Sequence, residues 1–153
     1  MEALLQLLDE GGASLASAAR RLGLSEGQAL AHLAVVGRSR AVDGSQALTA
    51  VQSWGLIRVI LRAGTCVAEI MSDLGAARVA GSWWNDEDAR VHLHLDTSGI
   101  RGAFLTSKVG HASGRTVRMV AFVDEQGEVL FKVMVPKERA DLIPAFNALR
   151  GET

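Results

Sequence analysis

The amino-acid sequence predicts an α+β fold, in which a small N-terminal helical part precedes a large antiparallel β-sheet and a C-terminal helix. The composition changes near residue 55: Ala and Leu recur at helical spacing before it, and Val, Ile and Trp dominate after it. The apolar segments of the second part follow one another through short turns, which is typical of antiparallel pairing rather than of βαβ units. We expect one domain over residues 1–153, with the helical part in 1–54 and the sheet and closing helix in 55–153.

Four helices are predicted in residues 1–54. After the first, each begins at a polar residue whose side chain can accept a backbone N–H, namely Ser14, Ser25 and Ser45. Glycines follow the ends of the predicted helices, as expected for residues that adopt left-handed conformations easily. The second and third helices with the short turn between them resemble a helix-turn-helix.

Seven apolar segments are interpreted as strands, and they span 56–62, 65–71, 77–84, 89–95, 100–108, 115–123 and 128–135. The polar residues 85–88, which read NDED, are predicted to form a turn. Pro136 is placed in the first turn of a closing helix, which Pro144 should kink or split. Cys66 lies in an apolar strand segment, where we expect a buried and inert thiol.

Composition and charge exclude several classes of protein. With 16 basic and 17 acidic residues, the net charge of −1 provides no general attraction to nucleic acid or to anionic membranes. No apolar run approaches the roughly 20 residues that span a bilayer. The first ten residues lack the basic region of a signal peptide. A cytoplasmic protein without membrane insertion is therefore expected.

The segment 83–104 contains the most informative residues. His92 and His94 alternate with apolar residues, so a strand places both imidazoles on one face, about 7 Å apart. Imidazole binds transition metals, and the neighbouring Trp83 and Trp84 offer flat apolar surfaces. Because the two tryptophans are adjacent, a strand places them on opposite faces, and one of them is expected in the core. A solvated strand face or a partner interface explains these residues too. A zinc site is not predicted, because CxxC and HExxH spacings are absent from the sequence.

Two further features leave alternatives open. Arg62, at the end of a predicted strand, could bind a carboxylate or remain a solvated charge. The helix-turn-helix pattern allows a DNA-binding regulator as an alternative, but its second helix contains no Lys or Arg. We therefore expect the helices to form a packing module, and no nucleic-acid partner.

Several segments, in their order and spacing, resemble one structural repeat of the HemS-type haem utilisation proteins. They read LGLSE, WGLIRVILR, WWNDEDARVHLHLDTSGIRGAF and VDEQGEVLFKVMVP. The length and the single repeat are more similar to the ChuX/HutX haem carriers. The resemblance covers about residues 14–150. It implies a broad antiparallel sheet with helices around it, a homodimer, and cytoplasmic binding of haem for storage or transfer.

The resemblance also implies roles for individual residues. His94 matches a histidine implicated in haem binding and is expected to ligate the haem iron, with His92 as the second choice. Arg62 stands where the ChuX-like proteins carry another implicated histidine. In the HemS type the matching position is an arginine that contacts haem, so Arg62 is expected to pair with a propionate. Trp83 and Trp84 would pack on the macrocycle. In the HemS type a histidine-rich run follows the strand that corresponds to the one carrying His94, and this chain lacks that run. The chain also contains no tyrosine.

The sequence therefore predicts a dimeric, cytoplasmic haem-binding protein, a carrier rather than a catalyst. Its expected cofactor is haem, and a haem-degrading enzyme or another acceptor protein is its expected partner. Since some relatives degrade haem, a haem-degrading activity is an alternative to the carrier function.

Overall fold

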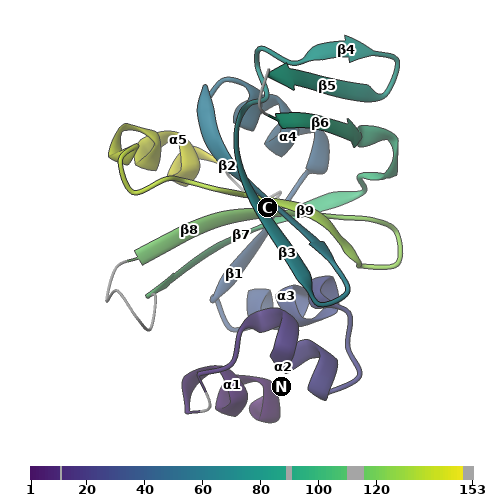
Figure 1. The fold of residues 1–153 in the computed structure, drawn as a ribbon. Helices are drawn as coiled ribbons and strands as arrows, with labels where there is room; N and C mark the ends of the chain where they lie inside the picture. Colours follow the sequence, from purple (N-terminus) through teal and green to yellow (C-terminus); the bar gives the residue numbers. More distant parts are fainter. Residues whose placement is uncertain (11, 89–90, 110–115, 150–153) are drawn as a thin grey trace.

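The computed structural model describes residues 1–10, 12–88, 91–109 and 116–149. Figure 1 shows three helices at the N-terminal end, a six-stranded sheet across the middle, and a small three-stranded sheet at the opposite end. Both sheets are antiparallel throughout. The predicted α+β class, with N-terminal helices and an antiparallel sheet, is confirmed.

The helices of the N-terminal part are α1 (Glu2–Asp9), α2 (Leu15–Arg21), α3 (Glu26–Val35) and α4 (Gly44–Gln52). Of these, α2 and α3 begin where the capping pattern predicts. Ser14 accepts the backbone N–H of Ser17 at the start of α2, and Ser25 forms a reciprocal capping box with Gln28 at the start of α3. The expectation that Ser45 starts the fourth helix is wrong by two residues, because the Asp43 carboxylate caps α4.

The large sheet has the strand order β1-β7-β8-β9-β2-β3. Its strands are β1 (Ser39–Val42), β2 (Leu56–Ala63), β3 (Cys66–Asp73), β7 (Gly102–Val109), β8 (Thr116–Val123) and β9 (Val129–Met134). The sequence did not predict β1, a four-residue strand that pairs with β7 at the sheet edge. Four residues are too few for a periodic pattern to stand out, and only the pairing with β7 makes them a strand.

The small sheet corrects two predictions. It consists of β4 (Arg78–Ala80), β5 (Trp83–Asp88) and β6 (Val91–Asp96), followed by the 3₁₀-helix η1 (Thr97–Gly99). The predicted strand 77–84 is divided by a turn, because Gly81 adopts a φ of +60° and reverses the chain. The predicted turn at 85–88 is the body of β5, whose backbone groups pair with β6.

Two further predictions are wrong or only partly met. Cys66 is exposed rather than buried, because it begins β3, the edge strand of the large sheet, whose first residues face water. The closing helix is much shorter than 137–150: it consists of the 3₁₀-helix η2 (Ala140–Leu142) and α5 (Ile143–Ala148). Pro144 lies in the first turn of α5, where its missing N–H costs no helical hydrogen bond.

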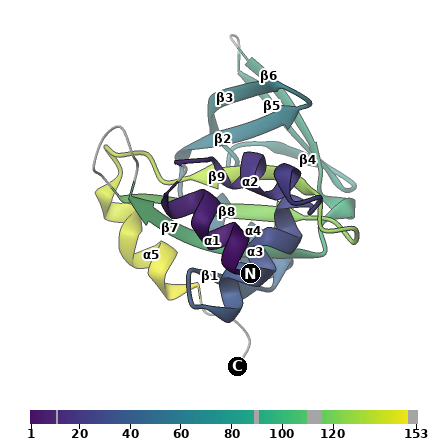
Figure 2. The ribbon, with the colours of Figure 1, turned by 90° about the horizontal axis from the view of Figure 1, so that it is seen from below.

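The described residues form two separate hydrophobic cores. The main core lies between the two sheets, α4 and the closing segment, and includes Trp54, Trp84 and Phe122. The second core lies within α1–α3 and is built largely from alanine and leucine. Figure 2 shows these three helices lying across β8 and β9. The helical part therefore packs as a unit of its own against one face of the large sheet.

The contact between α3 and the β8–β9 turn explains how this unit is attached. The backbone N–H of Gly27 donates to the carbonyl of Gly127 over 2.9 Å. A Cβ atom added at Gly27 would lie 2.4 Å from that oxygen, so only glycine allows this approach. The first turn of α3, which would meet base edges in a DNA-recognition helix, is instead held against the protein's own sheet.

Candidate functional site

The exposed face of the small sheet carries most of the residues that the sequence singles out. Because side chains alternate along strands, β5 presents Trp83, Asn85 and Glu87 on this face, and β6 presents His92 and His94. In the register, Asn85 lies opposite His94 and Glu87 lies opposite His92. We call these five residues the imidazole face.

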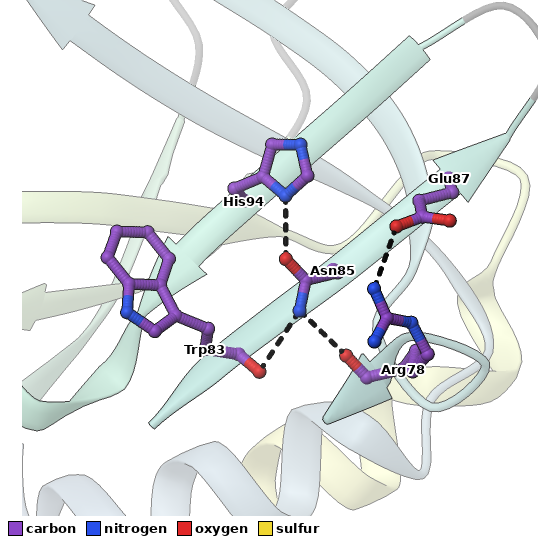
Figure 3. Close-up of polar contacts among 5 residues, drawn as sticks. All are labelled: Arg78, Trp83, Asn85, Glu87 and His94. Carbon is purple, nitrogen blue, oxygen red and sulfur yellow. Dashed lines mark hydrogen bonds and ion pairs between the residues drawn. The ribbon is translucent and has the colours of Figure 1, made fainter. Parts of the chain in front are cut away.

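Hydrogen bonds connect the imidazole face to β4, as Figure 3 shows. Nδ1 of His94 lies 2.6 Å from Oδ1 of Asn85. The Asn85 amide nitrogen donates to the backbone carbonyls of Arg78, over 3.1 Å, and of Trp83, over 3.4 Å. The Arg78 guanidinium hydrogen-bonds Glu87 over 3.0 Å and thereby lowers the pKa of that carboxyl group. His94 is therefore anchored on one side, and its ring remains exposed.

The two imidazoles are neighbours but do not form a metal centre by themselves. Their ring centroids lie 6.4 Å apart, with an interplanar angle of 62°. Within the described residues, no three His, Cys, Asp or Glu side chains are arranged so that they could hold a metal ion.

The two tryptophans lie on opposite faces of β5. Trp83 is 47% exposed and belongs to the imidazole face, whereas Trp84 is 6% exposed and packs in the main core. The structure therefore brings Trp83, His92 and His94 onto one face, and it places Trp84 away from them. Strict alternation along a strand requires this separation for adjacent residues.

A cavity of about 810 Å³ lies between α1–α3 and the large sheet. Of the five site residues expected from the sequence, only Arg62 lines it. Apolar side chains of the helices and of the sheet make up most of the rest of its wall, among them Leu15, Leu30, Ile60, Met119 and Met134. Met119 and Met134 are directly opposite each other on β8 and β9. The cavity thus presents apolar surface and soft thioether sulfurs.

Charged groups also line this cavity. Lys132 on β9 forms an ion pair with Glu26, and Arg38 binds Asp9 through two hydrogen bonds of 2.7 and 2.8 Å. No ion pair from Arg62 to another described residue is present. Arg62 is therefore the guanidinium at the cavity wall that an anionic ligand meets without displacing a protein carboxylate.

Sequence reasoning missed the cavity, although one signal pointed to it. The segment 117–123 is apolar at nearly every position, so both faces of β8 are suited to burial. Val120 and Phe122 are buried on the main-core side, while Val117, Met119 and Ala121 line the cavity. An unbroken apolar strand indicates a sheet covered on both faces, and here the second cover is the helical part.

The family-model comparison matches residues 38–149 to the family described as haem utilisation ChuX/HutX. This chain belongs to the ChuX/HutX haem utilisation family. The match begins at the strand β1 and covers both sheets, so it includes the imidazole face and the sheet side of the cavity. A comparison with curated proteins finds no match.

Several solved structures share the fold of this chain. A protein of Agrobacterium tumefaciens is 20% identical, with a TM-score of 0.76 over 97% of this chain and 87% of the other. The heme-binding protein ChuX is 14% identical, with a TM-score of 0.72 over 90% of this chain and 89% of the other. The heme-degrading enzyme ChuS of Escherichia coli O157:H7 is 19% identical, with a TM-score of 0.81 over 97% of this chain but only 44% of ChuS. At these identities, the likeness shows a common fold.

Among the described residues, no helix is both long and apolar enough to cross a membrane.

Proposed function

We propose that this protein binds haem in the cytoplasm, holds it and passes it to an acceptor protein. The observation that carries the proposal is the cavity of about 810 Å³, whose largely apolar wall contains an arginine with no ion-pair partner among the described residues. Its volume lies within the roughly 300–1,000 Å³ range of small-molecule sites. Haem is a flat apolar ring with two carboxylates at one edge, and this wall suits both parts.

Burial would supply most of the binding free energy. Each Å² of apolar porphyrin surface removed from water contributes about 25 cal/mol, so a site that encloses the ring binds far more tightly than a flat face. Arg62 would pair with a propionate, and a charge-assisted bond of this kind contributes about 1.5–3 kcal/mol. The exposed imidazole face alone offers no such enclosure.

We further propose that the iron ligand is His94 of a second copy of the chain. His94 does not line the cavity that contains Arg62, so the two residues would act on one haem across an interface between two copies. Trp83 is exposed beside His94 and would be covered in the same interface. Two-fold symmetry would then create two equivalent sites in a homodimer.

Haem titration, followed by the Soret band, tests the cavity. Arg62→Ala is expected to weaken haem binding about 10-fold or more, because about 1.4 kcal/mol corresponds to one factor of ten. The matched control is Arg21→Ala, which removes an exposed guanidinium of α2 that does not line the cavity. Equal affinities for wild type, Arg62→Ala and Arg21→Ala would contradict the assignment of Arg62.

Mixing two variants tests the proposed interface. His94→Ala is expected to change the Soret spectrum, whereas His32→Ala, on an exposed histidine of α3, should not. In a mixed dimer of Arg62→Ala and His94→Ala chains, one of the two sites keeps both side chains. Co-refolded mixtures should therefore recover part of the wild-type spectrum that neither variant shows alone. A wild-type spectrum for His94→Ala, or a monomeric mass by sedimentation, would overturn this arrangement.

Adding a reductant and oxygen to the haem complex separates a carrier from a haem-degrading enzyme. A carrier keeps its Soret band when catalase removes free peroxide, and an enzyme loses it. We do not propose DNA binding, because α3 contains no Lys or Arg and its first turn is packed against the β8–β9 turn.

A further inference from the structure

We propose that Asn85 is a positioning residue, which fixes the tautomer of His94 so that the unprotonated Nε2 faces outward as the metal-binding atom. The inference deepens the proposed function, on which it depends for the identity of the bound iron. The tautomer itself is a property of the haem-free protein and can be measured without any ligand.

The orientation of the Asn85 amide follows from its neighbours on β4 and β5. Its nitrogen lies 3.1 Å from the carbonyl oxygen of Arg78 and 3.4 Å from that of Trp83. Carbonyl oxygens only accept hydrogen bonds, so the amide NH₂ must face them and not the ring. The Oδ1 atom of Asn85 consequently faces His94, as Figure 3 shows.

The orientation of the amide then determines where the imidazole proton lies. Oδ1 of Asn85 carries no hydrogen, so the 2.6 Å contact with Nδ1 of His94 requires that Nδ1 be the donor. A neutral imidazole has one N–H, so Nε2 keeps its lone pair. Free neutral imidazole side chains place the proton on either nitrogen, whereas this contact selects one form.

The arrangement depends on all three strands of the small sheet. Asn85, on the middle strand β5, lies opposite His94 of β6 and opposite Arg78 of β4. The position of the imidazole ring therefore depends on the pairing of β5 with both neighbouring strands. The short strand β4 supplies the Arg78 carbonyl that holds the amide. An orienting oxygen on the second nitrogen is the usual companion of a metal-binding histidine, and its loss typically costs 10–100-fold in metal affinity.

His92 provides an internal control on the same strand. It is exposed like His94, but among the described residues no hydrogen bond to its ring nitrogens is present, and Glu87 opposite it is bound by Arg78. We therefore expect His94 to adopt one tautomer and His92, two residues away, to adopt a mixture of both tautomers.

The test is ¹⁵N nuclear magnetic resonance of the haem-free protein, at a pH about two units above the ordinary imidazole pKa of about 6.5. In the wild type, His94 should show a protonated Nδ1 and an unprotonated Nε2, while His92 shows the mixture found in free histidine. Asn85→Leu should return His94 to the mixture. The His92 signals and the urea unfolding midpoint should not change in Asn85→Leu, and they serve as the control for a folded protein.

A wild-type His94 with its proton on Nε2, or an unchanged tautomer in Asn85→Leu, would overturn the inference. Haem titration of the same variants separates this result from the proposed function. If Asn85→Leu changes the tautomer and also weakens iron ligation 10–100-fold, both proposals are supported. If the tautomer changes but the Soret spectra of wild type, Asn85→Leu and His94→Ala agree, Asn85 still positions His94, and the assignment of His94 to iron fails.

Discussion

Nζ of Lys132, on β9, lies 2.5 Å from Oε1 of Glu26, the first residue of α3. Only 18% and 10% of the two side chains are exposed, so this ion pair is shielded from water at the wall of the cavity. It joins the helical part, which has its own core, to the large sheet, which belongs to the other core. Glu26 is the chain neighbour of Gly27, so the ion pair and the Gly27–Gly127 hydrogen bond both attach the first turn of α3 to the β8–β9 hairpin.

Breaking this ion pair should destabilise the protein. Glu26→Gln leaves Lys132 without its counter-charge in a poorly hydrated place, and a loss of about 3 kcal/mol in the free energy of unfolding is expected. Removing both charges, as in Glu26→Gln with Lys132→Met, should cost less than the single change. Urea unfolding measures both effects. Arg78→Ala, which breaks an exposed pair, is the control and should leave the unfolding midpoint nearly unchanged. If Glu26→Gln changes the unfolding midpoint as little as Arg78→Ala does, the Glu26–Lys132 pair is hydrated like an exposed ion pair.

The close approach at Gly27 predicts a second effect on stability. In Gly27→Ala, the added Cβ would meet a backbone oxygen that cannot rotate away, so α3 must shift from the β8–β9 turn. Such overpacking typically costs about 1–3 kcal/mol. Gly99→Ala is a suitable control, because its Cβ would make only an ordinary contact at 3.7 Å. Similar unfolding midpoints for the two variants would mean that the helix adjusts without loss.

The N-cap of α4 predicts a dependence of stability on pH. Hydrogen bonds from the Ser45 hydroxyl and the Gln46 backbone N–H lower the pKa of Asp43 below its ordinary value. A lowered pKa in the folded state stabilises the protein above the unfolded pKa of about 3.9, and this contribution disappears as the pH falls through the folded value.

The Asn variant separates capping from charge at this position. Asp43→Asn keeps a capping oxygen but does not titrate, so between about pH 5 and pH 2 its stability should fall less steeply than that of the wild type. Asp43→Ala should lower the thermal midpoint already at neutral pH, because the cap itself is lost. Parallel pH profiles for the wild type and Asp43→Asn would show that Asp43 does not contribute to acid sensitivity.

Substitutions of the two adjacent tryptophans should have different effects, one on the free energy of unfolding and the other on haem binding. Trp84→Ala removes a ring from the main core and is expected to cost about 3–5 kcal/mol of unfolding free energy. Trp83→Ala, on the imidazole face, should cost less than about 1 kcal/mol and should instead weaken haem binding and dimer formation. Chemical unfolding, haem titration and sedimentation distinguish the two variants. A large loss of stability in Trp83→Ala would place that ring in the structural framework instead.

Much of the fold could be predicted from the sequence, because the signals involved are local. The caps at Ser14 and Ser25 and the antiparallel succession of strands depend on residues close together in the chain, and they appear as predicted. The polar segment 85–88 misled the prediction, because its polarity is typical of a turn. In the structure the segment is half of a hairpin, and its backbone is satisfied by pairing with β6.

By itself, the sequence determined the alternation that puts His92 and His94 on one face and Trp83 and Trp84 on opposite faces, because side-chain direction along a strand is a property of the backbone. Only the tertiary structure decided that Arg62 lines a cavity and that the histidines and tryptophans do not. The cavity exists only where the helical part docks on the large sheet. The hydrogen bond between Asn85 and His94 was likewise decided only by the tertiary structure. It arises from the register of three strands, and register is set by the packing of the whole sheet rather than by any one segment.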